Sequence, residues 1–350
     1  MNVQAISFTN KQHYPQFKNQ ASLQKTIDVV ALQAPSMQPA SFQEVASLNI
    51  QADNIQKSAK SVKNAAKFAY DEARSFLWDA AQYQNQAREI FAKIQEKIDE
   101  LECEGKDILQ YKSVIMNLSN KDKLSEIVLK DGKAIVYSAE SSSWSSFDKY
   151  EIDLKTGELL TFKKAYKPYK NDVALETGYT YVADVMASQY SASEEYAFVN
   201  GDLVTCDLGV ANKDYKKSDK RFTFSNGELI GVMFGVKETS GPNAKVSAER
   251  RFSFLKEDKL MAYYRNYELQ SRLRTRSADI VYEFNNGEDL GAFTRGYSQN
   301  SINSWSCKEV FKFSQEQIKE VVFGEKKNVY GSSFQKRYNF IDGEAFIERS

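Results

Sequence analysis

Histidine and cysteine, which carry much of enzyme catalysis and metal binding, are scarce in this sequence of 350 residues. The only histidine, His13, lies in a polar N-terminal stretch. Catalytic triads, Cys-His pairs and histidine-ligated metals are therefore not expected. The three cysteines, Cys103, Cys206 and Cys307, are too widely spaced for a CxxC metal site, and their odd number does not suggest a disulfide framework. We expect reduced, mostly buried thiols and no metal-binding residues.

An enzyme without histidine would need a carboxylate pair, a Ser–Lys dyad or a tyrosine. The acidic neighbours Glu288 and Asp289 follow an Asn-Gly pair, and adjacent residues in a turn point apart rather than across a cleft. Neither of the glycine-rich phosphate-binding patterns, GxGxxG and GxxxxGK[ST], occurs. We therefore predict no catalytic residues, no cofactor-binding residues and no cofactor, and a protein that is not an enzyme.

Basic residues with nearby tyrosines form three clusters at or near expected loops. Gathered on one rim, they would bind a polyanion. Lysine plus arginine equals aspartate plus glutamate, at 47 each, so solvated loops are the alternative interpretation. The clusters are Lys163, Lys164, Lys167 and Lys170 with Tyr166 and Tyr169; Lys213, Lys216, Lys217, Lys220 and Arg221 with Tyr215; and Arg265, Arg272, Arg274 and Arg276.

A long helix is the first element of the chain with clear boundaries. Ser41 and Glu44 fit a capping box, and no proline occurs between Pro39 and Pro168. The first glycine after the capping box is Gly105, which suits a helix end. The sequence predicts a helix over 41–105, a rod of roughly 95 Å at 1.5 Å per residue.

Apolar residues of this helix repeat every seven positions, which is typical of a coiled-coil seam. Three partners suit the seam: another copy of the protein, which we favour; the chain's own sheet; or a second half of the helix after a break near 84–86. From Tyr70 onward a third stripe (Tyr70, Leu77, Phe91, Ile98) widens the apolar face. The two series of the seam are Val45, Ala52, Ala59, Ala66, Ala73, Ala80, Ala87, Ile94 and Leu101, and Leu48, Ile55, Val62, Ala69, Phe76, Tyr83, Ile90 and Lys97.

From Ile127 onward the period changes to two, with turn residues between strands. An apolar-x-apolar unit recurs every 26 to 30 residues from Tyr196 onward, which indicates repeated β-hairpins. Asn-Gly and Asp-Gly pairs predict two-residue turns with positive φ. The pairs are Asp131-Gly132, Asn200-Gly201, Asn226-Gly227, Asn286-Gly287 and Asp342-Gly343; the units are Ile127-x-Leu129, Tyr150-x-Ile152, Tyr196-x-Phe198, Phe222-x-Phe224, Phe252-x-Phe254, Tyr282-x-Phe284, Phe311-x-Phe313 and Tyr338-x-Phe340.

Two-residue turns also predict the register of the hairpins. Phe222 is expected opposite Gly231, and Tyr282 opposite Gly291. The longer step after Tyr150 has room for an extra hairpin near 179–182. The segment 150–159 resembles the hairpin units of the YD-repeat and MORN-repeat families, although the period here is longer. That resemblance implies hairpins and no particular function.

Together these patterns predict an α+β protein: a long N-terminal amphipathic or coiled-coil helix, then an antiparallel all-β domain of hairpins arranged as a meander sheet, a sandwich or an open barrel. We expect a flexible polar tail at 1–40, the helix at 41–105, a connector at 106–126 and the hairpin domain at 127–350. The N-terminus lacks the features of a signal peptide, so a cytoplasmic location is the default expectation, with non-classical export or a virion as alternatives.

A structural or interaction protein is the function that this organisation favours. The helix would oligomerise or brace, so that the partners are another copy through 42–104 and a protein or glycan at the β-domain loops. No strong nucleic-acid signal and no transmembrane segment is seen. The alternatives are a carbohydrate-active β protein, either a glycan binder or a carboxylate-dependent hydrolase, and a polyanion-binding module. Two close carboxylates in a cleft, with Trp144 or Trp305 exposed beside them, would favour the carbohydrate-active alternative.

Overall fold

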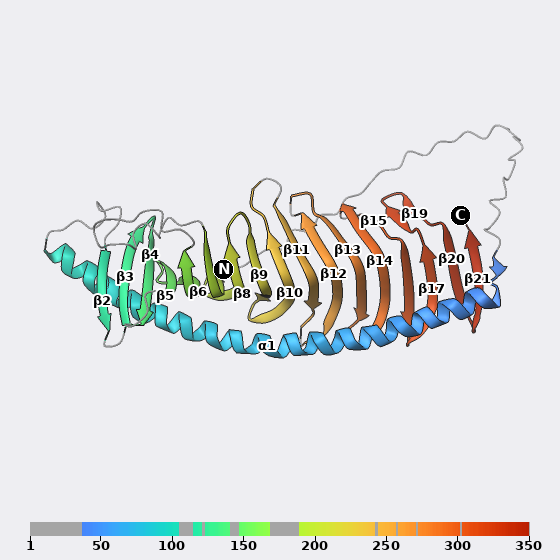
Figure 1. Ribbon diagram of the computed structural model, residues 1–350, viewed down its shortest axis with the longest axis horizontal. Coiled ribbons are helices and arrows are strands. Elements are labelled where there is room, and N and C mark those ends of the chain that lie inside the picture. The colour runs from blue at the N-terminus through green and yellow to red at the C-terminus, as the bar shows by residue number, and fades with distance from the viewer. Residues whose placement is uncertain are drawn as a thin grey trace, which may run out of the picture. The chain divides into compact units, whose positions relative to one another are not determined.

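The computed structural model describes residues 37–104, 115–120, 123–140, 147–168, 189–241, 244–256, 258–270, 272–301 and 303–349. Within these ranges one helix is followed by a single antiparallel sheet, so the expected α+β class is confirmed at that level (Figure 1). His13, Trp144, Lys170 and the hairpin expected near 179–182 lie outside the described residues.

The sheet is a meander in which most strands pair with their neighbours in sequence. The principal order runs from β2 through β14, then β16, β17, β20, β21 and β1, while β15, β18 and β19 form a side branch from β14. The helix is α1 (Phe42–Cys103), and the strands are β1 (Gln38–Pro39), β2 (Ile115–Asn120), β3 (Lys123–Lys130), β4 (Lys133–Glu140), β5 (Phe147–Asp153), β6 (Leu159–Pro168), β7 (Tyr190–Val199), β8 (Asp202–Asn212), β9 (Lys216–Ser225), β10 (Glu228–Glu238), β11 (Lys245–Phe254), β12 (Leu260–Gln270), β13 (Thr275–Asn285), β14 (Asp289–Ser301), β15 (Ser304–Ser306), β16 (Glu309–Ser314), β17 (Gln317–Phe323), β18 (Lys326–Asn328), β19 (Gly331–Ser333), β20 (Lys336–Ile341) and β21 (Glu344–Arg349).

The start of α1 has the capping box that its sequence predicts. The Ser41 hydroxyl accepts a hydrogen bond from the Glu44 amide, and the Glu44 carboxylate accepts one from the Ser41 amide. Two residues earlier, Gln38 and Pro39 pair with the edge of β21, so the folded unit begins inside the expected 1–40 tail. Likewise, β2 lies inside the expected 106–126 connector and adds one strand before the predicted β domain.

Asn-Gly and Asp-Gly pairs occupy hairpin tips throughout the sheet. Four of the five predicted pairs form two-residue turns with both residues at positive φ. The fifth differs, because Asn286 and Gly287 form a three-residue loop together with Glu288, between the paired Asn285 and Asp289. A further turn, Gln315-Glu316, has positive φ at both residues without asparagine or glycine, so turn chemistry did not identify it.

A β-bulge beside the turn changes the predicted register in six hairpins, whereas the hairpins of Asp131-Gly132 and Asp342-Gly343 keep it. Leu229 pairs with Phe224 as expected, but Phe222 pairs with Val232 rather than Gly231, because the strand carries one extra residue. Tyr282 likewise pairs with Phe293 rather than Gly291. The bulge puts two consecutive residues on the same face of the sheet. The pairing of aromatic rings with glycines, inferred from the turns alone, is therefore wrong.

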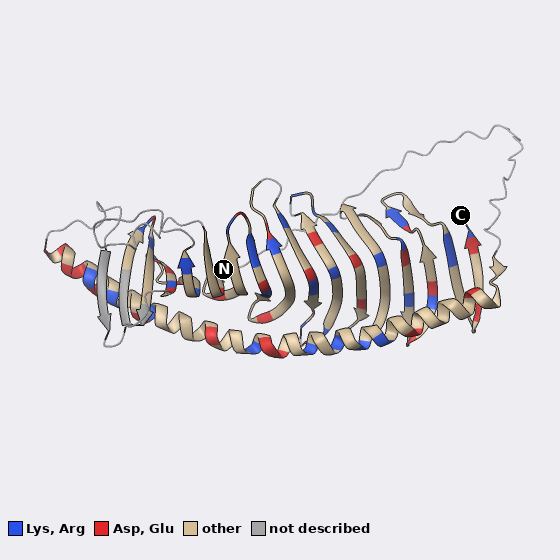
Figure 2. Ribbon diagram, in the orientation of Figure 1, with Lys and Arg blue, Asp and Glu red and all other residues tan. Residues whose placement is uncertain are grey.

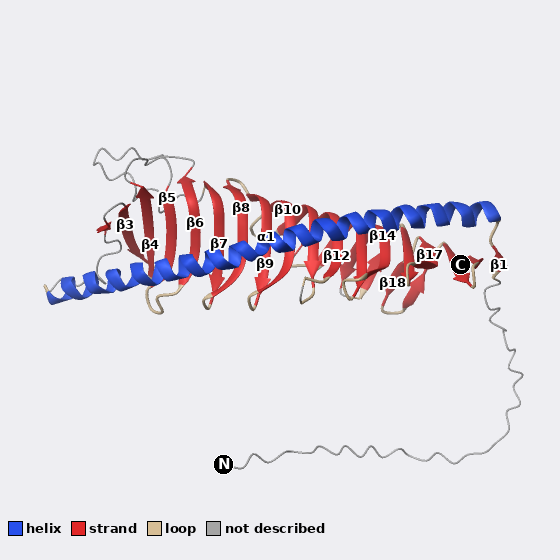
Figure 3. Ribbon diagram, turned by 90° about the horizontal axis from the view of Figure 1, so that it is seen from below, coloured by secondary structure: helices blue, strands red, loops and turns tan. Residues whose placement is uncertain are grey.

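The core lies between α1 and one face of the sheet, along which the helix crosses the strands obliquely (Figure 3). All eight apolar-x-apolar units contribute to this core, as do the alanines of the heptad seam. Phe76 contacts the rings of Phe222 and Tyr196, and Tyr83 stacks on Phe162. The expected coiled coil is not confirmed: the seam packs on the chain's own sheet, the second of the three alternatives.

One stripe of α1 contacts one hairpin turn after another at intervals of seven residues or a multiple of seven. Gln56 and Gln84 donate to the carbonyls of Glu316 and Gly201, and Lys63 donates to the carbonyl of Glu288 at 2.6 Å. The same stripe places Tyr70 against Phe254 and Phe91 against Gly157. The stripe therefore includes the Tyr70 and Phe91 positions that the sequence showed as a third apolar row.

Candidate functional site: the second face of the sheet

The face of the sheet turned away from α1, here called the second face, carries a row of charged residues. Five of them lie immediately before the first aromatic residue of an apolar-x-apolar unit: Lys149, Glu195, Arg221, Arg251 and Arg337. Strand alternation turns the aromatic residue toward α1 and the charged residue away from it. Lys163, Glu195, Asp207 and Arg221 are consecutive partners across β6 to β9.

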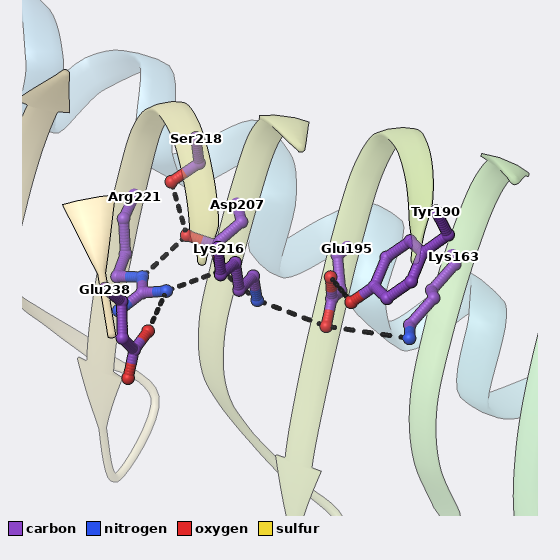
Figure 4. A network of polar contacts seen from close by, with 8 residues as sticks. All are labelled: Lys163, Tyr190, Glu195, Asp207, Lys216, Ser218, Arg221 and Glu238. Carbon is purple, nitrogen blue, oxygen red and sulfur yellow. Dashed lines mark hydrogen bonds and ion pairs between the residues drawn. The ribbon is translucent and has the colours of Figure 1, made fainter. Parts of the chain in front are cut away.

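Asp207 is the most deeply buried charge of this row, with its side chain 1% exposed. Three side chains of β9 donate to it (Figure 4). Ser218 Oγ lies 3.1 Å and Arg221 Nε 2.6 Å from Oδ1, and Lys216 Nζ lies 2.8 Å from Oδ2. Arg221 also reaches Glu238 of β10, with Nη2 2.8 Å from Oε2. The buried carboxylate is thus fully coordinated by side chains of a single neighbouring strand.

Glu195 lies opposite Asp207 in the β7–β8 register and extends the network toward β6. Its carboxylate accepts a hydrogen bond from Tyr190 Oη at 2.9 Å, and its Oε1 lies 3.2 Å from Lys216 Nζ. Lys163 Nζ lies 3.9 Å from the same oxygen and 3.9 Å from the centre of the Tyr190 ring. The three cations Lys163, Lys216 and Arg221 therefore balance the three carboxylates of Glu195, Asp207 and Glu238.

The charges of this network set its protonation state. Burial opposes ionisation of Asp207, but the hydrogen bonds from Arg221 and the charge of Lys216 outweigh it and hold the pKa of Asp207 below its ordinary value. Burial likewise acts against the charged form of Lys216, yet Glu195 and Asp207 raise its pKa. Burial, together with the nearby charge of Lys149, lowers the pKa of Lys163 despite the opposing attraction of Glu195.

Glu195 and Asp207 are two close, buried carboxylates of the kind that a glycoside hydrolase would need. Their surroundings suit a different role. Lys216 bridges them, Asp207 is held by Arg221, and Glu195 is held by Tyr190, so their oxygens are engaged within the chain. A general acid needs a raised pKa, whereas that of Asp207 is lowered. The arrangement is that of a structural ion-pair network.

The predicted basic clusters are divided between the two faces of the sheet. Lys163, Lys216 and Arg221 join the second-face network, whereas Lys164 and Lys220 lie toward the helix. Lys164 pairs with Glu194 at 2.8 Å, and Lys220 pairs with Glu72 of α1 at 2.6 Å. Strand alternation therefore splits what looked like one patch in sequence, and acids accompany the basic residues along the strands (Figure 2).

Other predicted candidates are placed apart from this network. Cys206 and Cys307 are buried and Cys103 is exposed, and all three are free thiols. Glu288 and Asp289 line a small recess beside Lys60 and Lys63 of α1. Trp305 packs partly buried against Cys307 and its neighbours. Within the described residues, no group of three or more His, Cys, Asp or Glu side chains is arranged to hold a metal ion.

Sequence reasoning did not identify Tyr190, Glu195, Asp207 or Glu238 as one group. One sequence signal could have identified part of the group. A charged residue directly before an aromatic-x-aromatic pair, repeated in successive hairpins, predicts a row of charges on the second face. No helix in the described part of the chain combines the length and apolar character required to cross a membrane. Comparison with protein-family models, curated proteins and solved structures finds no match for this chain.

Proposed function

We propose that this protein is a non-enzymatic interaction scaffold, in which α1 braces the hairpin sheet and the second face and loops meet a partner. The observation that carries the proposal is the equal spacing of helix and hairpins. Seven helical residues rise about 10.5 Å, and two antiparallel strands span about 9.6 Å. A helix tilted by about 24° from the perpendicular to the strands therefore advances one heptad for each hairpin.

The contacts of α1 support this matching. Lys63 and Gln56 are seven residues apart and donate to the turns of neighbouring hairpins, β13–β14 and β16–β17. Gln84 and Phe91 are likewise seven apart and contact the turns of β7–β8 and β5–β6. A brace of this kind holds each hairpin at a fixed distance from the next, and a single-layer sheet needs such support to keep one shape.

We further propose that the hairpins are copies of one unit. A second position with positive φ follows the turn by eight residues in five hairpins, and by nine in the hairpin whose loop is one residue longer. The return of the same backbone conformation at the same distance from the turn supports a common backbone plan beneath diverged side chains. The pairs are Gly157 and Ala165, Gly201 and Gly209, Gly227 and Gly235, Asp258 and Asn266, Glu316 and Gly324, and Gly287 and Gly296.

Insertions into α1 test the bracing role. Adding seven residues after Ala66 moves the first part of the helix by one hairpin and keeps its apolar seam on the sheet. Adding five residues at the same place turns the seam of one part away from the sheet by about 150°. We expect hydrogen exchange to show retained protection of β9–β14 after the seven-residue insertion and lost protection after the five-residue one. Equal behaviour of the two variants would refute the bracing role.

Self-association through 42–104 is a separate expectation, and the buried seam argues for bracing instead. We expect light scattering to give a monomer for the full chain, because the alanines that a second helix would need are already packed on the sheet. A 106–350 truncation loses α1, exposes the aromatic rows and is expected to aggregate. A full chain that forms a concentration-dependent dimer, with a monomeric truncation, would instead assign the helix to oligomerisation.

A further inference from the structure

Four consecutive hairpins carry an extra apolar residue beside their turns, on the second face. The bulge after each turn puts this residue between a residue that faces α1 and a residue of the second face, so that two consecutive side chains lie on the second face. Its side chain is 43% exposed at Ile230 and 41% at Met261, and Val199 at the end of β7 is 57% exposed. The four bulge residues, here called the bulge row, are Leu160, Val204, Ile230 and Met261.

The bulge row ends at a defined strand and is flanked by small side chains. In the next two hairpins the same position holds Gly291 and Lys319, so the apolar row stops after β12. The register neighbours beside it on the second face are small side chains, of which Ser253 and Ala262 are buried. These neighbours are Thr161, Ala197, Thr205, Thr223, Gly231, Ser253 and Ala262, consecutive partners across β6 to β12.

An acidic residue accompanies the bulge row in three of the four hairpins. Glu158, Asp202 and Glu228 each follow the glycine of a turn, two residues before the apolar bulge residue, and all three are exposed. On the helix side the same turns already face basic residues. Arg88 of α1 lines a recess together with Glu158 and Asp202, and Lys60 occupies the equivalent place beside Glu288. Three of the four turns thus present an acidic residue beside the bulge row, and Lys259 holds the equivalent place in the fourth.

We propose that the bulge row binds an amphipathic helix of a partner protein, with a bulky apolar residue at every seventh position and a lysine or arginine on the flank beside the turns. This inference rests on the proposed scaffold function and specifies its partner. Hairpins spaced by about 9.6 Å select a heptad repeat on this face for the same reason that they select it on the other. The acidic turns select the basic flank.

The complementary sizes of the side chains distinguish this partner from α1. On the covered face, large aromatic residues of the strands meet alanines of the helix. On the second face the strand residues beside the bulge row are small, so the docking helix must supply the bulk. Four bulge residues span three hairpin intervals, about 29 Å, which about 20 residues of helix cover.

A synthetic helical peptide tests the inference on the intact chain. The probe is a fluorescent peptide of about 24 residues with leucine at every seventh position and lysine on one flank, and the control peptide has the same composition with both residues at every fifth position. We expect saturable binding of the heptad peptide by fluorescence anisotropy, and at least about tenfold weaker binding of the control, which is about 1.4 kcal/mol.

Protein variants locate the site. Ile230→Asp and Met261→Asp each change an exposed side chain and are expected to weaken binding at least about tenfold, whereas Val329→Asp, at a 67% exposed position in the β18–β19 turn, leaves it unchanged. Equal binding of both peptides, no saturable binding, or equal effects of the three substitutions would overturn the inference. So would occupation of the bulge row by a second copy, seen as a rise in mass that Ile230→Asp abolishes. Unlike the helix insertions, these measurements leave bracing by α1 untouched.

Discussion

Replacing Phe76 by alanine removes the one phenylalanine of the α1 seam from the middle of the helix–sheet interface. The Phe76 ring is 9% exposed, and its centre lies 4.8 Å from that of Phe222 and 6.4 Å from that of Tyr196. The same helix offers a matched control in Phe68, eight residues earlier and 76% exposed. Both changes remove the same atoms from the same helix, so their comparison isolates burial against the sheet.

The expected magnitudes follow from that burial. Truncating a buried phenylalanine costs about 3–5 kcal/mol of the free energy of unfolding, through lost transfer energy and the cavity left behind. Phe68→Ala should change it by no more than about 0.5 kcal/mol. Combining Phe76→Ala with Phe222→Ala should reveal a coupling of about 0.5–1.5 kcal/mol, because the two rings are in contact.

Urea unfolding followed by circular dichroism measures these differences, at two widely separated protein concentrations. Because the interface lies within one chain, the loss at Phe76 should be the same at both concentrations. A loss that shrinks as concentration rises would show that a second copy contributes to the seam. Equal losses for Phe76→Ala and Phe68→Ala would refute the packing of this helix face on the sheet.

Three further predictions concern the charged network, the helix start and a glycine with positive φ in β10. Asp207→Asn removes the buried carboxylate that Arg221 and Lys216 share, leaving Arg221 with Glu238 alone, and should lower stability by about 3–5 kcal/mol in urea unfolding; a loss under about 1 kcal/mol would contradict the network. The hydrogen bond from Lys336, with those from Ser41 and Tyr338, lowers the pKa of Glu44 to about 2. Its charged form therefore stabilises the fold above pH 4.5, and this contribution is lost as the pH falls toward 2. The melting temperatures of the native chain and Glu44→Gln should converge over that range, and a constant gap would count against this role. Gly235 has φ of 62°, and an added Cβ would meet the Glu249 side chain at 2.8 Å, so Gly235→Ala should cost about 1–3 kcal/mol by thermal unfolding, and an unchanged melting temperature would contradict it.

The candidate site could be predicted only in part, because local patterns do not reveal lateral neighbours. Lys216 and Arg221 were recognised as basic residues near a loop. Their carboxylate partners, Glu195 and Asp207, lie on other strands, and only the register brings the four side chains together. The bulges shift that register by one residue, and no single residue type marks them, since the extra position holds glycine at Gly291 and lysine at Lys319.

The sequence by itself determined the local structure: the capping box starts α1, asparagine, aspartate and glycine place most of the turns, and alternation chooses the face on which each aromatic pair is buried. Only the tertiary structure decided what the heptad seam packs against. A seven-residue repeat shows which face of the helix is buried and how far apart its contacts lie. A rise of about 10.5 Å per heptad suits packing on a second helix and packing on a tilted row of hairpins equally well. The seam packs on the sheet because long-range strand pairing brings the aromatic residues together in rows. These rows must be buried, match the helix in length and lie on the same chain.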